Sequence, residues 1–345
     1  MKILYGVQAT GNGHITRARA LLPALQQQGI EVDFLFSGRS EAQLFDMAMF
    51  KDYGWANGFT FSSRNGKVKP LSTLGQLKPL QFIKDVRQLD VSAYDLVLTD
   101  FEPVSAWAAK RQGILSVGLA RQYALRHPLA GKQSVTWLKA AVSVFAPAQH
   151  YLGVHWQPDY PDLLPPLLSA PAVFNQPANF ASFEPFILVY LPFEQLTQVL
   201  AWLKQYPVWQ FKLYTDIKAP YQDENVKLLP FSRQAFPLDL HHASGVICNS
   251  GFGLCSEALR AGKKLLIKPL KGQIEQAYNA YTLANMAKAS VFSDFTANVL
   301  DTWLQQEAAQ PYAFPDPLPA VAQWLKQGCV RPVSDVVRQA WQQNE

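Results

Sequence analysis

The sequence predicts an α/β protein with two Rossmann-like, doubly wound domains and a cleft between them, and three observations support this fold class. The chain opens with an apolar strand, a helix and a second strand over residues 2–36, and such a βαβ unit implies a parallel sheet. The same alternation of strands and helices begins again at residue 185. Eight prolines between Pro158 and Pro192 separate the two parts, as in a stiff linker.

These observations set the expected domain boundaries. Residues 1–157 are predicted to form the first Rossmann-like domain, and residues 158–184 the proline-rich linker. Residues 185–317 form the second domain. The segment 318–345 contains two further helical patterns, and we expect these helices to cross back onto the first domain.

The composition narrows the class of protein. The chain has 345 residues, 49% hydrophobic and 17% charged, which indicates a globular protein with room for two cores. The net charge of +5 is spread along the chain, so we expect no nucleic acid as partner. Three cysteines make no disulfide framework, and neither a signal peptide nor an apolar run of about 18 residues is evident. We therefore expect a cytoplasmic protein.

The turn after the first strand is a candidate functional site. It contains Gly11, Gly13 and His14, and ligands of parallel sheets bind outside the carboxyl ends of the strands. Arg17 lies one helical turn further on, where it contacts either a phosphate or a neighbouring carboxylate. The alternative for His14 is a helix cap without chemistry.

Two carboxylates follow a later strand at the same edge of the sheet. Asp100 ends the apolar strand, and Glu102 comes just before Pro103, which opens a helix. Either carboxylate is a candidate to orient the His14 ring or to position an acceptor. Glu102 also fits an ordinary helix start, because an acid is favourable there.

In the second domain, a strand, a glycine turn and a helix run from Val246 to Gly262. The turn consists of Asn249, Ser250, Gly251, Phe252 and Gly253, and the helix is predicted from Leu254 onward. Glycines let the backbone approach a bulky ligand, and free amides at a helix start favour an anion. Glu257 lies one turn along the same helix face, where it can accept hydrogen bonds from a ribose. An ordinary strand-to-helix turn is the alternative.

The next strand ends at Pro269 and leads into a loop and helix rich in polar side chains. Gln273, Glu275 and Gln276 lie at the start of this helix, and Asn279 follows. Sugar hydroxyls need hydrogen-bond donors and acceptors in fixed positions, and an acidic residue beside glutamine supplies both. These residues are therefore the candidate sugar contacts.

Together these stretches resemble glycosyltransferases of the GT-B fold, namely the N-acetylglucosaminyltransferase that makes lipid II and the glucosyl/glucuronosyl transferases. The residues that match their nucleotide-sugar region are Ser250, Gly251, Phe252, Gly253, Glu257, Pro269, Glu275, Gln276, Asn279 and Ala280. The string from Gly11 to Arg17 also resembles nucleotide-sugar hydrolases related to the lipid II enzyme, which carry Gly-x-Gly-His-x-x-Arg.

The resemblance implies a role for each candidate residue. His14 would remove the proton from the acceptor hydroxyl, a task suited to a group whose pKa lies near neutral pH. Phe231 and Ser232 would hold the nucleotide base through the backbone, and Arg233 would reach the diphosphate. The implied donor-binding set is Gly13, Arg17, Phe231, Ser232, Arg233, Asn249, Ser250, Gly251, Phe252, Gly253, Glu257, Gln273, Glu275 and Gln276. We expect no metal and no cofactor, because helix amides can stabilise the diphosphate.

The predicted function is therefore transfer of a hexose-type sugar from a nucleotide diphosphate sugar, a UDP-sugar first of all, to the hydroxyl of a lipid-linked or glycan acceptor. A nucleotide-sugar hydrolase or 2-epimerase on the same fold is one alternative, and a non-catalytic nucleotide-sugar binding protein is another. Lys67, Lys69, Lys78 and Lys84 suggest a peripheral contact with the inner face of a membrane, or else an ordinary solvated surface.

Overall fold

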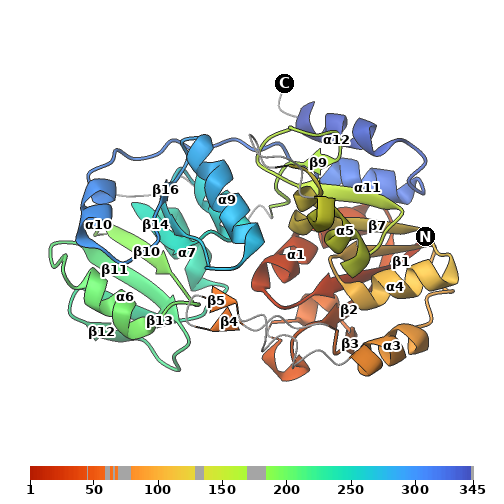
Figure 1. Ribbon diagram of the computed structural model, residues 1–345, viewed down its shortest axis with the longest axis horizontal. Coiled ribbons are helices and arrows are strands. Elements are labelled where there is room, and N and C mark those ends of the chain that lie inside the picture. The colour runs from red at the N-terminus through yellow and green to blue at the C-terminus, as the bar shows by residue number, and fades with distance from the viewer. Residues whose placement is uncertain are drawn as a thin grey trace. The chain divides into compact units, whose positions relative to one another are not determined.

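The protein is described by a computed structural model that covers residues 1–44, 46–58, 63–64, 67–68, 79–128, 136–168 and 184–342. It divides into two compact units. Met1–Ser62, Pro70–Ser169 and Phe314–Glu345 form the first unit, and Ser63–Lys69 with Ala170–Ala313 form the second. Within the described ranges, each unit is built on one seven-stranded sheet (Figure 1).

The sheet of the first unit is parallel throughout, in the order β3-β2-β1-β6-β7-β8-β9. Its strands are β1 (Lys2–Gln8), β2 (Glu31–Ser37), β3 (Gly54–Ala56), β6 (Leu96–Asp100), β7 (Ser116–Ala120), β8 (His150–Val154) and β9 (Leu163–Leu164). The central strands read as continuous apolar runs because helices cover both faces of a parallel sheet. The direction of strand order reverses between β1 and β6, which makes this pair the switch point of the sheet.

The described helices of the first unit follow the strands along the chain, and the last two come after the final strand. They are α1 (Asn12–Gln27), α3 (Pro79–Gln88), α4 (Pro103–Gln112), α5 (Thr136–Phe145), α11 (Leu318–Lys326) and α12 (Val333–Gln342), with the 3-10 helices η1 (Glu41–Gln43), η2 (Ala48–Phe50) and η3 (Arg121–Arg126). Helix α4 shows how the sequence sets the boundaries. Glu102 caps its start, and Gly113, with a φ of 70°, ends it.

The two terminal helices contact the first unit. Lys326 of α11 donates a hydrogen bond to the carbonyl of Gly29, at the end of α1, at 3.3 Å. Trp341 of α12 donates from Nε1 to the carbonyl of Leu163, in β9, at 2.7 Å. The ring of Trp324, which is fully buried, packs edge-on against His150.

Part of the predicted linker belongs to the first sheet. Leu163–Leu164, inside the expected linker 158–184, form strand β9, so that boundary was wrong. Prolines are tolerated beside a short edge strand because it needs few ladder hydrogen bonds, which explains the error. Residues 169–183 of the predicted linker lie outside the described residues.

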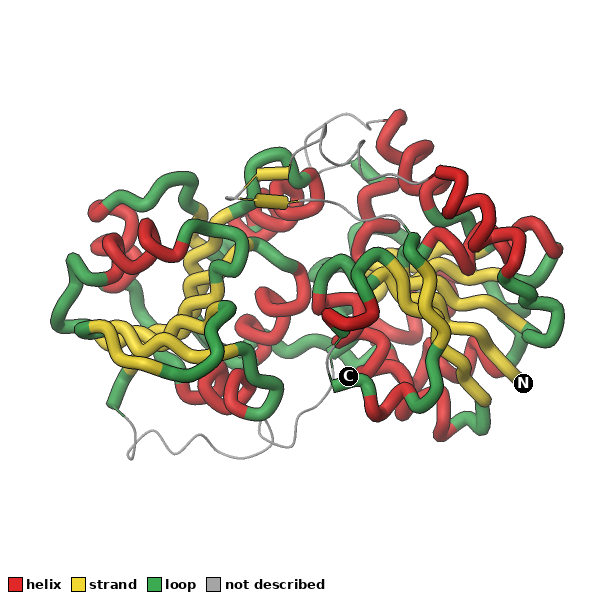
Figure 2. The backbone as a smooth tube through the Cα atoms, turned by 90° about the horizontal axis from the view of Figure 1, so that it is seen from below, coloured by secondary structure: helices red, strands yellow, loops and turns green. Residues whose placement is uncertain are grey.

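The second unit has a mixed sheet in the order β12-β13-β11-β10-β14-β15-β16. The strands are β10 (Phe186–Tyr190), β11 (Gln210–Thr215), β12 (Tyr221–Asp223), β13 (Val226–Pro230), β14 (Gly245–Asn249), β15 (Lys264–Lys268) and β16 (Ser290–Val291). Only the pairing of β12 with β13 is antiparallel among the pairs of this described sheet. The switch point lies between β10 and β14. Figure 2 shows the strands as yellow tubes with helices around them.

The helices of the second unit are α6 (Leu196–Leu203), α7 (Ala235–His242), α8 (Phe252–Arg260), α9 (Ile274–Asn285) and α10 (Ala297–Leu304). One face of the sheet packs against α6 and α10, through the fully buried rings of Trp202 and Trp303. A short hairpin of β4 (Ser63–Arg64) and β5 (Lys67–Val68) completes the unit.

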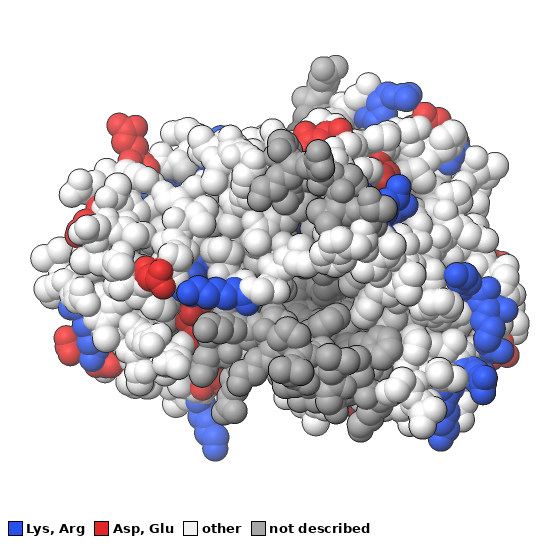
Figure 3. Space-filling view, viewed as in Figure 1, with Lys and Arg blue, Asp and Glu red and all other residues white. Residues whose placement is uncertain are grey.

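The structure confirms the predicted fold class, two doubly wound α/β units. None of the helices in the described chain is long and apolar enough to cross a membrane. On the face shown in Figure 3, lysine and arginine side chains are scattered over both units among uncharged residues.

Candidate functional site

The turn between β1 and α1 leaves open space in front of its glycines. Helix α1 begins at Asn12, after the N-cap residue Gly11, and no side chain caps it. Neither Gly11 nor Gly13 has a positive φ, and a Cβ added at either would meet nothing within 4 Å. Neither position therefore needs glycine for its φ or for lack of space, although glycine at the N-cap position of Gly11 is common in helices. A bare backbone suits the approach of a bound molecule.

His14, Arg17 and Asp100 come together at the switch point of the first sheet. Nδ1 of His14 lies 2.7 Å from Oδ1 of Asp100, at the end of β6. Arg17 donates to both carboxylate oxygens of Asp100, from Nε at 2.7 Å and from Nη2 at 2.5 Å. Asp100 is fully buried, and the other two side chains are about nine-tenths buried. Of the two predicted partners of Arg17, a phosphate or a neighbouring carboxylate, the structure shows the carboxylate.

The charges in this cluster favour the ionised form of Asp100. Burial alone would raise the pKa of Asp100, but the charges of Arg17 and His14 outweigh it and hold that pKa below its usual value. An ionised carboxylate only accepts hydrogen bonds, so the contact with Asp100 favours the tautomer with the proton on Nδ1 of His14. Nη2 of Arg17 also lies 3.1 Å from this nitrogen. When the ring is neutral and in this tautomer, Nε2 carries the lone pair.

Gln122 contacts this second nitrogen and was not among the predicted site residues. Its Nε2 lies 3.2 Å from Nε2 of His14, and it belongs to η3, directly after β7. An amide that donates here matches the tautomer favoured by Asp100. The feature of the sequence that could have identified Gln122 as a site residue is its position just after the carboxyl end of a central strand.

Glu102 lies near these residues in the sequence, but its carboxylate serves the helix. Its oxygens accept from the amides of Val104 at 2.8 Å and Ser105 at 2.7 Å, and from the hydroxyl of Ser37 at 2.7 Å. Burial raises the pKa of Glu102 above its usual value, against these hydrogen bonds. Of the two roles predicted for Glu102, in the active site or at the helix start, this geometry favours capping of the helix.

In the second unit, the glycine turn lies at the carboxyl end of β14. Helix α8 starts at Phe252, two residues earlier than the sequence predicted, with Gly251 as N-cap and no side-chain cap. Gly251 and Gly253 have ordinary φ values, and an added Cβ would meet nothing within 4 Å at either. The first amides of α8 have no acceptor within the helix, so they can bind an anion.

Polar contacts behind the turn fix its shape. Ser250 donates its hydroxyl to the carbonyl of Gln276 at 2.8 Å, and Asn279 donates from Nδ2 to the carbonyl of Ser250 at 2.9 Å. Oε1 of Gln276 accepts from the amide of Leu270 at 3.0 Å. All three polar side chains are buried, so the structure uses Ser250 and Gln276 to support the turn.

Other predicted contacts present acceptors that the described residues leave unused. No hydrogen bond from a described residue reaches the carboxylate of Glu257, which is partly exposed. Burial raises the pKa of Glu257 to about 7, although the charge of Arg260 works in the other direction. The amide oxygens of Asn249 and Gln273 are buried and lack a donor among the described residues. Such groups fit the hydroxyls of a ribose or a sugar.

The remaining predicted residues lie at the same carboxyl edge. Phe231, Ser232 and Arg233 follow β13, which is separated from β14 by β11 and β10. Phe231 is exposed, and its ring packs against Tyr190. The hydroxyl of Ser232 accepts from the amide of Ala235 at 3.0 Å. Glu275 lies in the first turn of α9.

A metal centre is not apparent in the part of the chain that the structure describes. No group of three or more His, Cys, Asp or Glu side chains is arranged there to hold a metal ion.

Comparison with known proteins agrees with the fold. The sequence model of the family described as Glycosyl transferase family 1 matches residues 1–307. None of the curated proteins matches the chain. Among solved structures, the glycotransferase of kitacinnamycin is similar with a TM-score of 0.60 and 17% identity, over 98% of this chain and 95% of that one.

Two further solved structures cover both sheets. The glycosyltransferase SnogD from Streptomyces nogalater has a TM-score of 0.57 and 15% identity, with 98% of each chain covered. MurG from Acinetobacter baumannii has a TM-score of 0.52 and 16% identity, with 98% of this chain and 92% of that chain covered. At these identities the likeness supports the two-domain GT-B fold.

Proposed function

Because the chain belongs to glycosyl transferase family 1, and is therefore an enzyme, we propose that it transfers a hexose-type sugar from a nucleotide diphosphate sugar, a UDP-sugar first of all, to an acceptor hydroxyl. The observation that carries this proposal is the ring of His14, whose Nδ1 lies 2.7 Å from Oδ1 of Asp100 and whose Nε2 lies on the other side of the ring, 3.2 Å from the amide of Gln122. Membership of an enzyme family argues against the alternative that the chain is a non-catalytic nucleotide-sugar binding protein.

In the proposed reaction, Nε2 of His14 takes the proton of the acceptor hydroxyl as its oxygen bonds to the anomeric carbon of the donor. The bond from that carbon to the diphosphate oxygen breaks, and the electron pair leaves with the nucleoside diphosphate. Asp100 stabilises the imidazolium that forms, and Arg17 keeps Asp100 ionised.

The glycine turn of the second unit is the proposed diphosphate site. The open space at Gly251 and Gly253 and the uncapped start of α8 support this assignment. We assign the ribose to Glu257, the sugar to Gln273 and Glu275, and the base to the backbone of Phe231 and Ser232. Arg233 and the helix amides would stabilise the leaving group, so the proposal requires no metal.

Water as the acceptor is the second candidate. Gly11 is the N-cap of α1, and Gly13, His14 and Arg17 lie in its first two turns, in the order that resembles the hydrolases. A hydrolase or 2-epimerase would use the same donor residues, and only the fate of the sugar would differ. Incubation with the donor alone separates the cases, since a transferase that lacks its acceptor releases little UDP.

The test of the proposal compares wild type with His14→Ala. We expect the variant to bind UDP within about twofold of the wild-type affinity and to lose about 10²–10⁴-fold in turnover, the range typical of a general base. UDP-sugar consumption is measured by chromatography, in the presence and absence of candidate acceptors. Normal turnover in the variant would reduce His14 to a helix-cap residue.

We also propose that the acceptor is presented at an anionic membrane surface. Of the predicted lysines, Lys69 and Lys78 lie outside the described residues, and Lys84 is exposed on α3. A second feature supports the contact. Residues 103–158 hold six Lys or Arg and no Asp or Glu. In this segment α5 exposes Trp137 and Val144 on one face, at 60% and 63%.

The membrane contact is tested by sedimentation with vesicles of phosphatidylglycerol or phosphatidylcholine. We expect binding to the anionic vesicles only, and a loss of at least tenfold for Trp137→Ser. Equal recovery of the wild type and of Trp137→Ser in the supernatant would remove this part of the proposal.

A further inference from the structure

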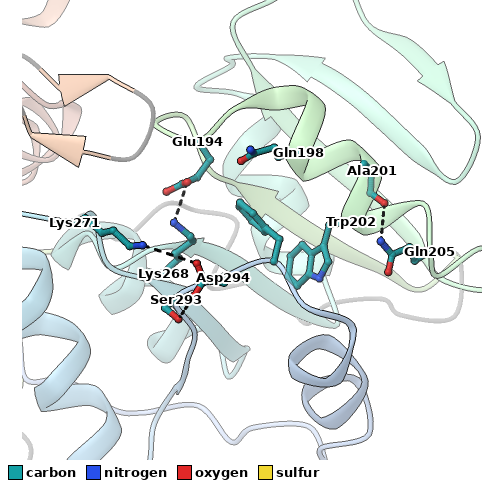
Figure 4. A pocket seen from close by; sticks show the side chains of 10 residues that line it. Glu194, Gln198, Ala201, Trp202, Gln205, Lys268, Lys271, Ser293 and Asp294 are labelled. Carbon is teal, nitrogen blue, oxygen red and sulfur yellow. Dashed lines mark hydrogen bonds and ion pairs between the residues drawn. The ribbon is translucent and has the colours of Figure 1, made fainter.

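A pocket of about 490 Å³ lies within the second unit, on the side of the sheet that carries α6 (Figure 4). It is placed where β10, β15 and β16 end, and its volume is in the range of small-molecule sites. The residues that line it are Glu194, Gln198, Ala201, Trp202, Gln205, Lys268, Lys271, Ser293, Asp294 and Phe295. None of the roles derived above uses this pocket.

One wall is a single face of α6 and the residues that follow it. Gln198, Ala201, Trp202 and Gln205 follow the helical spacing i, i+3, i+4 and i+7, which brings them to one side. The two glutamines and the alanine are exposed, while the Trp202 ring is buried beneath them and contacts Phe295, with 5.2 Å between ring centroids. This wall presents two amide groups, of which that of Gln205 also donates from Nε2 to the carbonyl of Ala201 at 3.2 Å. The ring of Phe295 beneath them is partly exposed.

The opposite wall comes from the segment after β16 and from Lys271. Asp294 accepts a hydrogen bond from the hydroxyl of Ser293 at 2.7 Å, and its carboxylate lies 3.9 Å from Nζ of Lys271. Figure 4 shows these polar groups facing the pocket across from α6. Donors and acceptors therefore occur on both sides.

A buried ion pair closes the inner end. Nζ of Lys268 lies 3.0 Å from Oε2 of Glu194, and both side chains are more than nine-tenths buried. Desolvation makes such a pair a poor source of stability, which suggests another reason for its presence. Oε1 of Glu194 also accepts from Nδ2 of Asn249 at 3.3 Å, so the pair contacts the residue that begins the glycine turn.

The chemistry of the lining selects the class of ligand. Its two lysines are balanced by Glu194 and Asp294, so neither an anion nor a cation gains from the net charge. The glutamines and Ser293 supply neutral donors and acceptors, and the partly exposed ring of Phe295 supplies an apolar surface. We propose that this pocket binds a neutral sugar residue, at a site separate from the glycine turn that binds the nucleotide.

The proposal is tested by saturation-transfer NMR and calorimetry on the full chain. The probes are glucose, galactose, mannose and N-acetylglucosamine, with glucuronic acid and glucose 6-phosphate as anionic counterparts. We expect saturable binding of at least one neutral sugar, in the absence of nucleotide and undiminished by UDP. Absence of binding, preference for the anionic sugars, or displacement by UDP would each overturn the proposal.

Variants locate the binding site. Gln198→Ala combined with Gln205→Ala should weaken sugar binding at least tenfold, and Ala201→Phe, which fills the pocket, should abolish it. Gln323→Ala is the matched control, because Gln323 is an exposed glutamine on α11 of the first unit. UDP binding confirms that each variant is folded and reports independently on the proposed nucleotide site. Unchanged sugar affinity in both pocket variants would place the sugar elsewhere and refute the assignment.

Discussion

Replacing Gly253 with alanine should raise the stability of the protein and impair donor binding. Gly253 is the second residue of α8, its φ is not positive, and an added Cβ would meet nothing within 4 Å. Alanine is favoured over glycine in helices by up to about 1 kcal/mol. With about 0.5–1 kcal/mol gained, the Tm of a domain of this size should rise by about 1–4 °C. The same methyl group would occupy the space proposed for the diphosphate.

The assay pairs thermal unfolding with calorimetric titration of UDP. We expect Gly253→Ala to weaken UDP binding at least tenfold, about 1.4 kcal/mol, while its Tm rises. Gly262→Ala, beyond the other end of α8, is the control. Gly262 has a φ of 67°, and its Cβ would approach Cδ of Pro311 at 2.8 Å, so this variant should lose stability.

The two glycine variants should therefore change stability in opposite directions, and only the first should weaken UDP binding directly. Unchanged UDP affinity in a folded Gly253→Ala protein would refute the diphosphate site. A lower Tm for that variant would show that glycine serves the fold itself.

Three further changes have definite expected outcomes. Asp100→Asn should reduce turnover by about 10²–10⁴-fold, which is measured by UDP release. It should also lower the free energy of unfolding by about 3–5 kcal/mol, because the buried Arg17 loses its counter-charge, and chemical denaturation measures this loss. Glu102→Ala should lower the free energy of unfolding by about 1–3 kcal/mol, because α4 loses its N-terminal cap. The kcat of the folded variant should stay nearly unchanged. A large loss of kcat would instead support a catalytic role for Glu102. For Glu257, a folded pKa of about 7 means that the folded state keeps a proton that the unfolded state releases. The free energy of unfolding should therefore fall as the pH rises from about 4.5 to 7. UDP affinity should rise over the same range as the carboxylate ionises. Glu257→Gln should flatten the pH dependence of both quantities.

The sequence predicted the architecture because the relevant signals are local. Apolar strands alternate with helices along the chain, and the carboxyl ends of parallel strands share an edge. The two glycine turns could thus be placed at the correct edge of each sheet without knowledge of any contact. The proline count misplaced one boundary, since β9 is too short to have a pattern of its own.

Side-chain partners were harder to predict because they depend on contacts between distant residues. His14 and Asp100 are 86 positions apart, and Gln122 and His14 are 108 positions apart. Both pairs meet only because β1, β6 and β7 are neighbours in the sheet. Likewise, the inward contacts of Ser250 and Gln276 depend on how α9 packs behind the turn, which helical spacing alone does not specify.

The central claim, that the enzyme uses a UDP-sugar, is tested most directly by thermal unfolding with a panel of nucleotides and nucleotide sugars in the presence of EDTA. A ligand at a hundred times its Kd stabilises the folded state by about 2.7 kcal/mol, equivalent to a rise in Tm of about 5 °C or more. We predict such a rise with UDP and UDP-sugars. No shift with any nucleotide, or a shift that requires a divalent metal ion, would contradict the account.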